Sequence, residues 1–194
     1  MGGPEITLAT SERVPLLAGV LAGSFAGDPM ITWPFHDHRV EERAEPLFTA
    51  ILAEYQRSDI VWEAGDGGGV AVWIPPGGDV GIDQMNVATR DAIPPLTDDG
   101  AERYHAFWGW LESHIPAEPH WMLDMVGVDP ERQGQGIGGA LVGHGLDLAE
   151  RDGVPAFLET GNPRNVPYYE RFGFLVIDEG DAPGGGPRIW FMRT

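Results

Sequence analysis

One segment, residues 126–139, combines an apolar strand pattern, a glycine-rich turn and the start of a helix pattern. Glycine lets the backbone approach a ligand closely, because it has no side chain and adopts conformations that other residues avoid. The first N–H groups of a helix have no partner within the helix and attract anions. Gly134, Gly136 and Gly138 alternate at this helix start, so an ordinary tight turn is the weaker interpretation. The segment therefore predicts a phosphate-binding site, and a pyrophosphate is its natural ligand.

The spacing Gly134-x-Gly136-x-x-Gly139 also matches the fingerprint of dinucleotide-binding proteins, and Glu159 lies about 20 residues on, where an acid for the ribose is expected. Five residues separate the strand end at Val128 from Gly134, whereas the dinucleotide fold turns almost at once. About 60 residues follow the motif, which is too few for the rest of a doubly wound sheet, and a helical hairpin of predicted elements precedes the motif instead of following it. We therefore reject the dinucleotide interpretation.

The pattern Gln133-x-x-Gly136-x-Gly138 resembles the acetyl-CoA loop of the GNAT superfamily of acetyltransferases. A second signature of this superfamily follows about 30 residues on, where Asn165 precedes Tyr169 by four positions and a Gly-Phe pair closes the helix. This resemblance implies the α/β GNAT fold, with helices flanking a mixed, mostly antiparallel central sheet of about 6–7 strands. It also implies a single acetyltransferase domain over residues 1–194 and an enzyme that transfers acetyl from acetyl-CoA to a primary amine.

Further matches extend from about residue 118 to the C-terminus and make the chain similar to the puromycin-acetylating members of this superfamily. They include residues 118–121, 149–151, 153–160 and 186–188. The resemblance implies a small-molecule amine as acceptor, either an antibiotic or an amino-acid-like metabolite, and a role in antibiotic resistance. Two alternatives stay open: a protein N-terminus as acceptor, and a non-catalytic acyl-CoA-binding module that regulates a partner.

The resemblance also assigns groups to acetyl-CoA, the co-substrate, and implies no metal. The strand backbone at Val126, Gly127 and Val128 is expected to bind the pantetheine arm like an added strand and to offer an N–H to the developing oxyanion. The amides that are expected to receive the pyrophosphate belong to Gln133, Gly134, Gln135, Gly136, Ile137, Gly138 and Gly139. Asn165 is expected to bond the cofactor, with a helix cap as the alternative.

Two side chains are predicted to handle protons. Tyr169 is the predicted general acid, because a phenol with a pKa of about 10 stays protonated at neutral pH and donates to a departing thiolate with a pKa of about 8.5. The adjacent Tyr168 is predicted to pack. Glu159, at a strand end, is predicted to accept the ammonium proton directly or through water, and a plain hydrogen bond to neighbouring backbone is an equally weighted alternative.

Three residues are candidates for binding the acceptor. Asp124 is predicted to anchor the cation, and Trp33 and Tyr104 are predicted to supply aromatic walls. Helical spacing also explains Tyr104 as a core residue. His36-x-His38 has no third ligand nearby in the sequence, so it is interpreted as a loop and not as a metal site.

Hydrophobic periodicity predicts the elements that must position these residues. Expected strands cover 6–9, 60–64, 70–74, 121–128, 156–159, 175–178 and 188–192, and expected helices cover 14–25, 40–55, 101–115, 136–152 and 165–172. Residues 28–35 are expected to be irregular, and residues 79–119 to be helical in pieces. A hairpin in the first half, followed by alternating strands and helices, indicates a mixed α/β sheet.

The composition excludes several kinds of chemistry. The chain has no cysteine, which excludes disulfides and a thiol nucleophile, and all 12 of its basic residues are arginine, which excludes a P-loop or Schiff-base lysine. A net charge of −18 disfavours nucleic-acid partners and attracts cationic amines. No run of 18 apolar residues occurs, so no membrane span is expected. We expect a cytoplasmic protein, for which a homodimer is compatible with the sequence.

Overall fold

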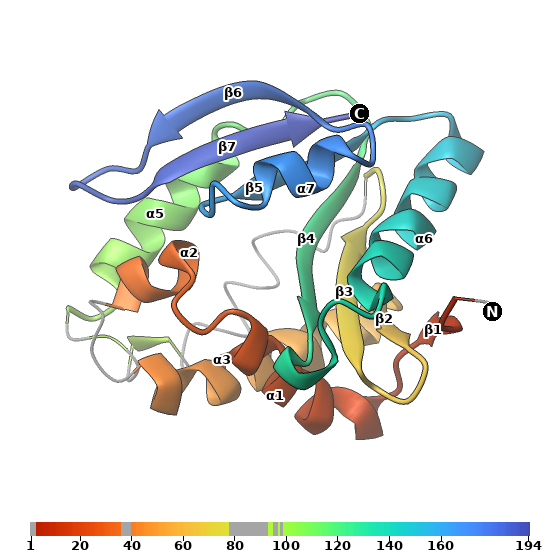
Figure 1. Cartoon of the computed structure of the whole chain (residues 1–194). Helices are drawn as coiled ribbons and strands as arrows, with labels where there is room; N and C mark the ends of the chain where they lie inside the picture. The colour runs from red at the N-terminus through yellow and green to blue at the C-terminus, as the bar shows by residue number, and fades with distance from the viewer. Residues whose placement is uncertain (1–2, 36–39, 78–92, 95–96, 98) are drawn as a thin grey trace.

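The computed structural model describes residues 3–35, 40–77, 93–94, 97 and 99–194 of the chain (Figure 1). The strands are β1 (Ile6–Leu8), β2 (Val61–Ala64), β3 (Gly69–Ile74), β4 (Trp121–Val128), β5 (Ala156–Thr160), β6 (Leu175–Asp181) and β7 (Arg188–Arg193). The α-helices are α1 (Val14–Ser24), α2 (Pro29–Thr32), α3 (Val40–Tyr55), α5 (Glu102–Glu112), α6 (Ile137–Asp152) and α7 (Val166–Glu170). Short 3-10 helices are η1 (Ser11–Arg13), η2 (Trp33–Phe35), η3 (Gln56–Ser58) and η5 (Pro130–Arg132).

The strands form one sheet in the order β1-β2-β3-β4-β5-β7-β6. All neighbouring strands are antiparallel except β4 and β5, which run parallel. This arrangement confirms the mixed, mostly antiparallel sheet flanked by helices that the sequence predicts. The one parallel pair lies in the middle of the sheet, where α6 makes the crossover from β4 to β5 (Figure 1).

Helices cover both faces of the sheet, which explains why β3 is buried along nearly its whole length. Val70 and Val72 point toward α1 and α3, where they join a core cluster with Leu17 and Leu21. Trp73, on the other face, packs under α6 in a second cluster. A third cluster joins α5 to β5 and β7. These three clusters hold β4 and β5 from opposite sides, so the residues of these strands have fixed positions.

The predicted elements agree with the observed ones at most positions, and three differences stand out. Helix α5 ends at Glu112, three residues before the predicted end. Residues 28–35 form α2 and η2 instead of an irregular segment, because the Asp28 carboxylate caps α2 by accepting from Met30 N at 2.8 Å and Pro29 occupies the first turn. Strand β6 runs to Asp181, three residues beyond the predicted end. Most of the predicted helical stretch before α5 lies outside the described residues, as do His36 and His38.

No single helix in the described part of the chain is long and apolar enough to cross a membrane. Residues 11–24 and 29–35 pass that test only as a pair, whose axes bend by 106°.

Two glycines of α6 should respond oppositely to alanine. A Cβ at Gly145 would lie 1.9 Å from Cε2 of Trp73, whose Nε1 donates to Leu141 O at 3.2 Å, whereas a Cβ at Gly143 meets no atom within 4 Å. We expect Gly145→Ala to destabilise the protein by about 1–3 kcal/mol through overpacking, and Gly143→Ala to stabilise it by up to about 1 kcal/mol through helix propensity. Thermal unfolding measures both, and equal Tm values for the two variants would contradict this packing.

Candidate active site

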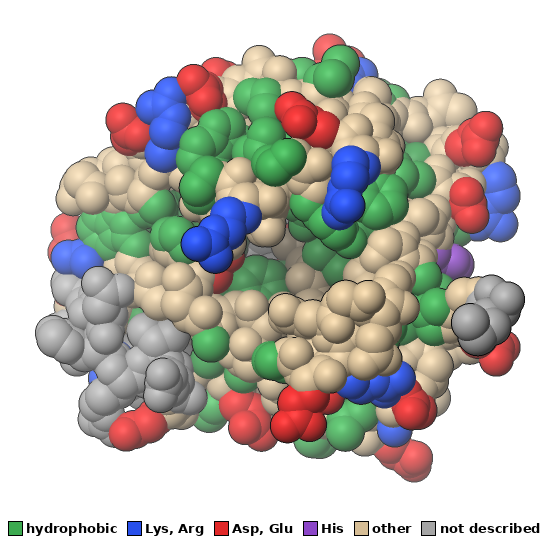
Figure 2. Space-filling view, viewed as in Figure 1, with side chains coloured by type: hydrophobic (Ala, Val, Ile, Leu, Met, Phe, Trp, Pro, Cys, Tyr) green, Lys and Arg blue, Asp and Glu red, His purple; other side chains and the backbone are tan. Residues whose placement is uncertain are grey.

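A cavity of about 1400 Å³ opens where β4 and β5 part. These strands pair only at their first residues, Trp121 with Ala156 and Met122 with Phe157. Beyond these pairs the two strands diverge, and most of the remaining residues of β4, together with Glu159 and Thr160 of β5, line the cavity. Figure 2 shows its mouth as a hollow near the centre of the face, with hydrophobic side chains inside and basic side chains at the upper rim.

The cavity has two ends, which we name by their walls. The helical end is lined by aromatic residues of α1, α3 and α5 and their flanks; they are Phe25, Phe48, Tyr55, Tyr104 and Trp108. The turn end is lined by residues 133–134 and 136–139 and by α7. Asp124 on β4 and Glu159 on β5 lie on the two strands that separate these ends.

Asp124 owes its position to a bulge in β4. The register between β3 and β4 shifts between Val72, which pairs with Met125, and Trp73, which pairs with Leu123. Asp124 is therefore the extra residue of β4, a type of irregularity that often re-aims a side chain next to an active site. Its carboxylate lines the cavity and accepts from the Tyr55 hydroxyl. Burial raises the pKa of Asp124 to about 6, and the Tyr55 hydrogen bond limits that rise.

Glu159 is the residue that links both ends of the cavity. Its Oε2 is buried and has no hydrogen-bond partner among the described residues. Burial, followed by the charge of Asp124, raises the pKa of Glu159 to about 8. The charge of Glu159 in turn helps to raise the pKa of Tyr55 at the helical end and that of Tyr169 at the turn end. Because the two carboxyl groups are coupled, they titrate as a pair that holds about one proton near neutral pH.

Tyr169 lies on α7, where its side chain is buried and lines the turn end. Burial is the main cause of a pKa well above the usual value for tyrosine, and the charges of Asp28 and Glu159 add to it. The phenol is therefore fully protonated at neutral pH. Tyr168 also lines the cavity, but its ring carries the guanidinium of Arg171 at 4.8 Å.

The turn before α6 is built on left-handed glycines. Gly134 has φ 76° and Gly136, the N-cap of α6, has φ 85°, so neither position suits an L side chain without strain. Because Gly136 has no side chain, the first N–H groups of α6 are not capped from that position and are available to an anion in the cavity. A Cβ at Gly138 would lie 3.1 Å from the Tyr168 hydroxyl, so α7 closes over the start of α6.

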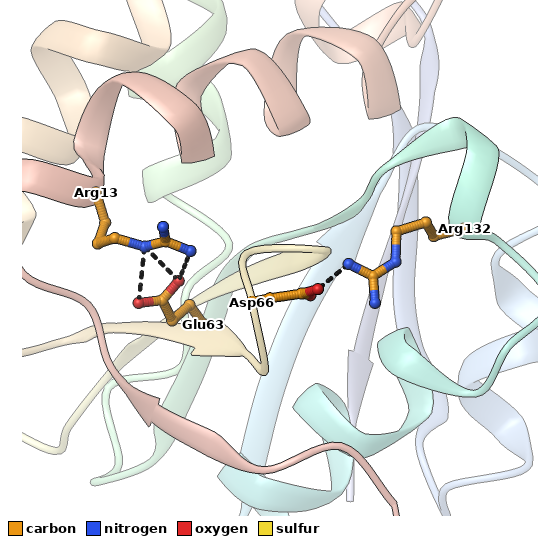
Figure 3. Close-up of polar contacts among 4 residues, drawn as sticks. All are labelled: Arg13, Glu63, Asp66 and Arg132. Carbon is orange, nitrogen blue, oxygen red and sulfur yellow. Dashed lines mark hydrogen bonds and ion pairs between the residues drawn. The ribbon is translucent and has the colours of Figure 1, made fainter.

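Two ion pairs tie neighbouring elements to β2 and the turn that follows it (Figure 3). Arg132, directly before the glycine turn, bonds Asp66 in the β2–β3 turn. This bond holds the pKa of Asp66 below its usual value. Arg13 Nη2, at the start of α1, donates to Glu63 Oε2 at 2.8 Å. Since Asp66 is largely exposed, we expect the Arg132 pair to orient the turn and to contribute little to stability.

The structure places several of the sequence-predicted cofactor residues on the cavity wall. Val126 and Val128 line it, and Val128 N donates to Ser24 Oγ at 3.4 Å. Asn165 also lines it, and its amide donates to Thr160 Oγ1 at 3.1 Å instead of capping α7. Gln133, Gly134, Gly136, Ile137, Gly138 and Gly139 complete this set.

Three predicted residues lie elsewhere. A Cβ at Gly127 would lie 2.9 Å from Leu21 Cδ2, so this glycine lets α1 cross β4 closely. Gln135 is exposed and is not part of the cavity wall. Trp33, predicted as an acceptor wall, instead packs under the guanidinium of Arg103 at 3.8 Å, in a separate surface hollow beside the turn that precedes β7.

Sequence reasoning missed three cavity residues. Tyr55 was visible only as the last apolar position of a helix pattern, although its hydroxyl bonds Asp124. Asp28 had a local signal, since an Asp-Pro pair often caps a helix. Ser24, at the end of α1, had no signal that connects it to β4. Among the described residues, no group of three His, Cys, Asp or Glu side chains is placed to hold a metal ion.

A family model described as the acetyltransferase (GNAT) family matches residues 92–174, a span that contains β4, the glycine turn, β5 and α7. Residues 92–174 therefore match the GNAT family of acetyltransferases. Members of this family use acetyl-CoA, and the two motifs that suggested the resemblance both fall inside the matched span.

The relatives of this chain are distant in sequence. An uncharacterised N-acetyltransferase of Schizosaccharomyces pombe is 24% identical over 172 residues, which cover 81% of this chain and 69% of that protein. A mycothiol acetyltransferase of Acidimicrobium ferrooxidans is 29% identical over 115 residues, which cover 55% of this chain and only 37% of that enzyme.

Solved structures share the GNAT fold over the whole chain. A Corynebacterium glutamicum structure, described as histone acetyltransferase HPA2 and related acetyltransferase, aligns with a TM-score of 0.74 at 24% identity and covers 99% of this chain and 96% of its own. Arylalkylamine N-acetyltransferase 2 of Aedes aegypti aligns with a TM-score of 0.69 at 14% identity and covers 100% of this chain and 99% of its own. At these identities the likeness concerns the fold.

Proposed function

We propose that this GNAT enzyme transfers an acetyl group from acetyl-CoA to the primary amine of a small molecule by direct attack on the thioester. One observation carries the proposal: Asp124, Glu159, Tyr55 and Tyr169 line one cavity, where the charge of Glu159 acts on both tyrosines and the charge of Asp124 acts on Glu159. A proton acceptor and a proton donor therefore flank one point in a single cavity. Acetyl transfer needs such a pair.

The turn end has the features that acetyl-CoA requires. The uncapped N–H groups at the start of α6 suit a pyrophosphate, and the wedge between β4 and β5 has room for the extended pantetheine arm. Asn165 and Tyr168 line the wall between these two places. We therefore assign the turn end to the cofactor and the helical end to the acceptor amine.

The residues then divide the proton transfers between them. Asp124 attracts the ammonium form of the acceptor, and Glu159 accepts one of its protons, so that the neutral nitrogen forms a bond to the carbonyl carbon. Backbone N–H groups of β4 face the oxygen on which negative charge develops. As the C–S bond breaks, Tyr169 donates its proton to the sulfur and recovers one from the nitrogen through solvent. The net release is one proton for each ammonium converted to an amide.

The chemical identity of the acceptor amine can be narrowed further. Structural neighbours include enzymes described as acting on arylalkylamines and polyamines, which supports a small amine as the acceptor class. The sequence likeness to puromycin-acetylating enzymes makes puromycin the first amine to test, and resistance to it the first physiological role. For such a role we propose a cytoplasmic enzyme.

Two measurements test the proposal. Calorimetry should detect acetyl-CoA binding, and an amine panel that includes puromycin should consume the thioester. Binding without turnover would favour the non-catalytic acyl-CoA-binding alternative. Turnover only with peptides would favour an N-terminal acetyltransferase.

The glycine turn permits a matched test of the cofactor assignment. Gly136 and Gly153 are the left-handed N-cap and C-cap glycines of the same helix, with φ 85° and 68°. Alanine at either position costs about 1–2 kcal/mol of backbone strain, but only Gly136 borders the cavity. We expect Gly136→Ala to weaken acetyl-CoA binding about 10-fold, the factor that 1.4 kcal/mol gives, and Gly153→Ala to leave it unchanged. Calorimetric titration measures both, and equal affinities would argue against phosphate binding at this turn.

A further inference from the structure

The described part of the cavity wall carries more acids than bases. Among its ionisable residues are five acids, namely Asp28, Glu112, Glu118, Asp124 and Glu159. Arg171 is the one arginine on the described part of the wall, and it lies at the turn end over the Tyr168 ring. The chain has no lysine to offset the acids. No described arginine therefore lines the helical end, and Oε2 of Glu159 is buried without a hydrogen-bond partner.

The same end offers an apolar surface to the rest of the acceptor. Phe25 and Phe48 contact each other with ring centroids 5.5 Å apart, and Tyr104 contacts Phe35 at 5.7 Å and Trp108 at 5.9 Å. All five rings line the cavity. Such walls favour a planar or branched apolar body, since burial of apolar surface is the main source of affinity in a pocket of this kind.

We propose, on the basis of the function proposed above, that the acceptor is an amine with an apolar, preferably aromatic body and no carboxylate or phosphate group near its nitrogen. An α-amino acid would bring its carboxylate to Asp124 and Glu159, where no described arginine can pair with it. Like charges in a poorly solvated site repel strongly. An amine, an amide or an ester of the same shape meets no such repulsion.

Three commercially available, matched amines separate the effect of the acceptor's charge from the effect of its shape. Phenethylamine lacks the α-substituent, phenylalaninamide carries it without charge, and phenylalanine carries it with charge. With saturating acetyl-CoA, we expect kcat/KM for phenylalanine to be at least ten-fold below that for phenylalaninamide, and the amide to be within a few-fold of phenethylamine. A ten-fold factor corresponds to about 1.4 kcal/mol of discrimination.

Other outcomes have distinct meanings. Equal kcat/KM values for phenylalanine and its amide would overturn the proposal and leave the acetyltransferase function intact. The proposal would also be overturned if kcat/KM for phenylalaninamide were as low as that for phenylalanine while phenethylamine was a good acceptor. The shape of the α-substituent, and not its charge, would then cause the discrimination. Absence of turnover with every amine, in protein that binds acetyl-CoA, would overturn the proposed function and this proposal with it.

A variant pair tests whether the wall charge is responsible. Asp28 lines the cavity and caps α2, and asparagine caps equally well, so Asp28→Asn removes a charge and keeps the helix start. Asp129 caps η5 in the same way, by accepting from Glu131 N at 3.0 Å, and is not part of the wall. We expect Asp28→Asn to raise the ratio of kcat/KM for phenylalanine to that for its amide several-fold, and Asp129→Asn to leave the ratio unchanged. An unchanged ratio in Asp28→Asn would overturn the electrostatic explanation.

Discussion

Replacing Tyr169 with Phe is expected to lower kcat at least about 100-fold while acetyl-CoA affinity changes less than about three-fold, since a positioned general acid contributes roughly 10²–10⁴ in rate. The phenylalanine ring keeps the packing of a side chain that is 7% exposed, and only the donor proton is lost. Without it the sulfur must leave as a thiolate in a site that already holds two carboxyl groups. Single-turnover kinetics with calorimetry would separate the chemical step from binding.

Tyr168 provides the control on the same helix turn. Its ring lies 5.3 Å from that of Tyr169, it also lines the cavity, and its hydroxyl lies beside the glycine turn at Gly138. We expect Tyr168→Phe to reduce acetyl-CoA affinity modestly and to leave kcat within a few-fold of the original. If the two variants have the same kcat, Tyr169 is not the acid.

Replacing Glu159 with Gln is expected to lower kcat/KM about 100-fold or more at neutral pH and to remove its rise with pH. A general base acts in its deprotonated form, so activity of the unaltered enzyme should increase as pH rises through the range of about 6 to 8 set by Asp124 and Glu159, and then level off. Measurements of kcat/KM from pH 5.5 to 9 test for this rise in activity. If kcat/KM of the Glu159→Gln variant still rises with pH over this range, another group is responsible for the rise.

The Glu159→Gln variant should be more stable than the original protein at high pH. A loss of activity in this variant would then reflect the loss of a base and not a loss of structure. The folded state holds the Glu159 proton up to a pKa of about 8, whereas the unfolded chain loses it near 4.5. Stability therefore falls as pH rises between these values, and glutamine escapes that loss. We expect a gain of about 2 kcal/mol above pH 8, or roughly 4–8 °C in Tm, and little gain at pH 4.5. Glu170→Gln, on the exposed side of α7, is the control.

The order and type of the elements followed from local sequence. Strand β4 has the predicted bounds, and α6 begins one residue after the predicted start, because strand runs and helix periodicity depend on residues close in the chain. The glycine turn was also evident locally, since left-handed backbone at Gly134 and Gly136 requires glycine. Segment 28–35 was misjudged because two very short helices depend on a single cap at Asp28.

The pairing of the proposed catalytic groups did not follow from local sequence. Tyr55 and Asp124 are 69 positions apart, and a β-bulge that is set by the register of β3 brings the carboxylate to the hydroxyl. Likewise, the family resemblance assigns the backbone of Gly127 to the pantetheine arm, whereas only the structure shows that α1 packs closely against this glycine. Neither the register of distant strands nor the path of a helix across a sheet is encoded in a short motif.

The sequence by itself determined the features that indicate the kind of protein: a glycine turn at a helix start that is predicted to bind phosphate, a tyrosine on the following short helix, and a family signature spanning both. These features depend on backbone conformation and residue type within a few positions. Only the tertiary structure decided which acids face the cavity, that Glu159 stands between its two ends, and that Trp33 lies outside it. Those outcomes arise from burial and from contacts between distant segments, because the pKa of a carboxyl group and the wall of a cavity depend on everything packed around them.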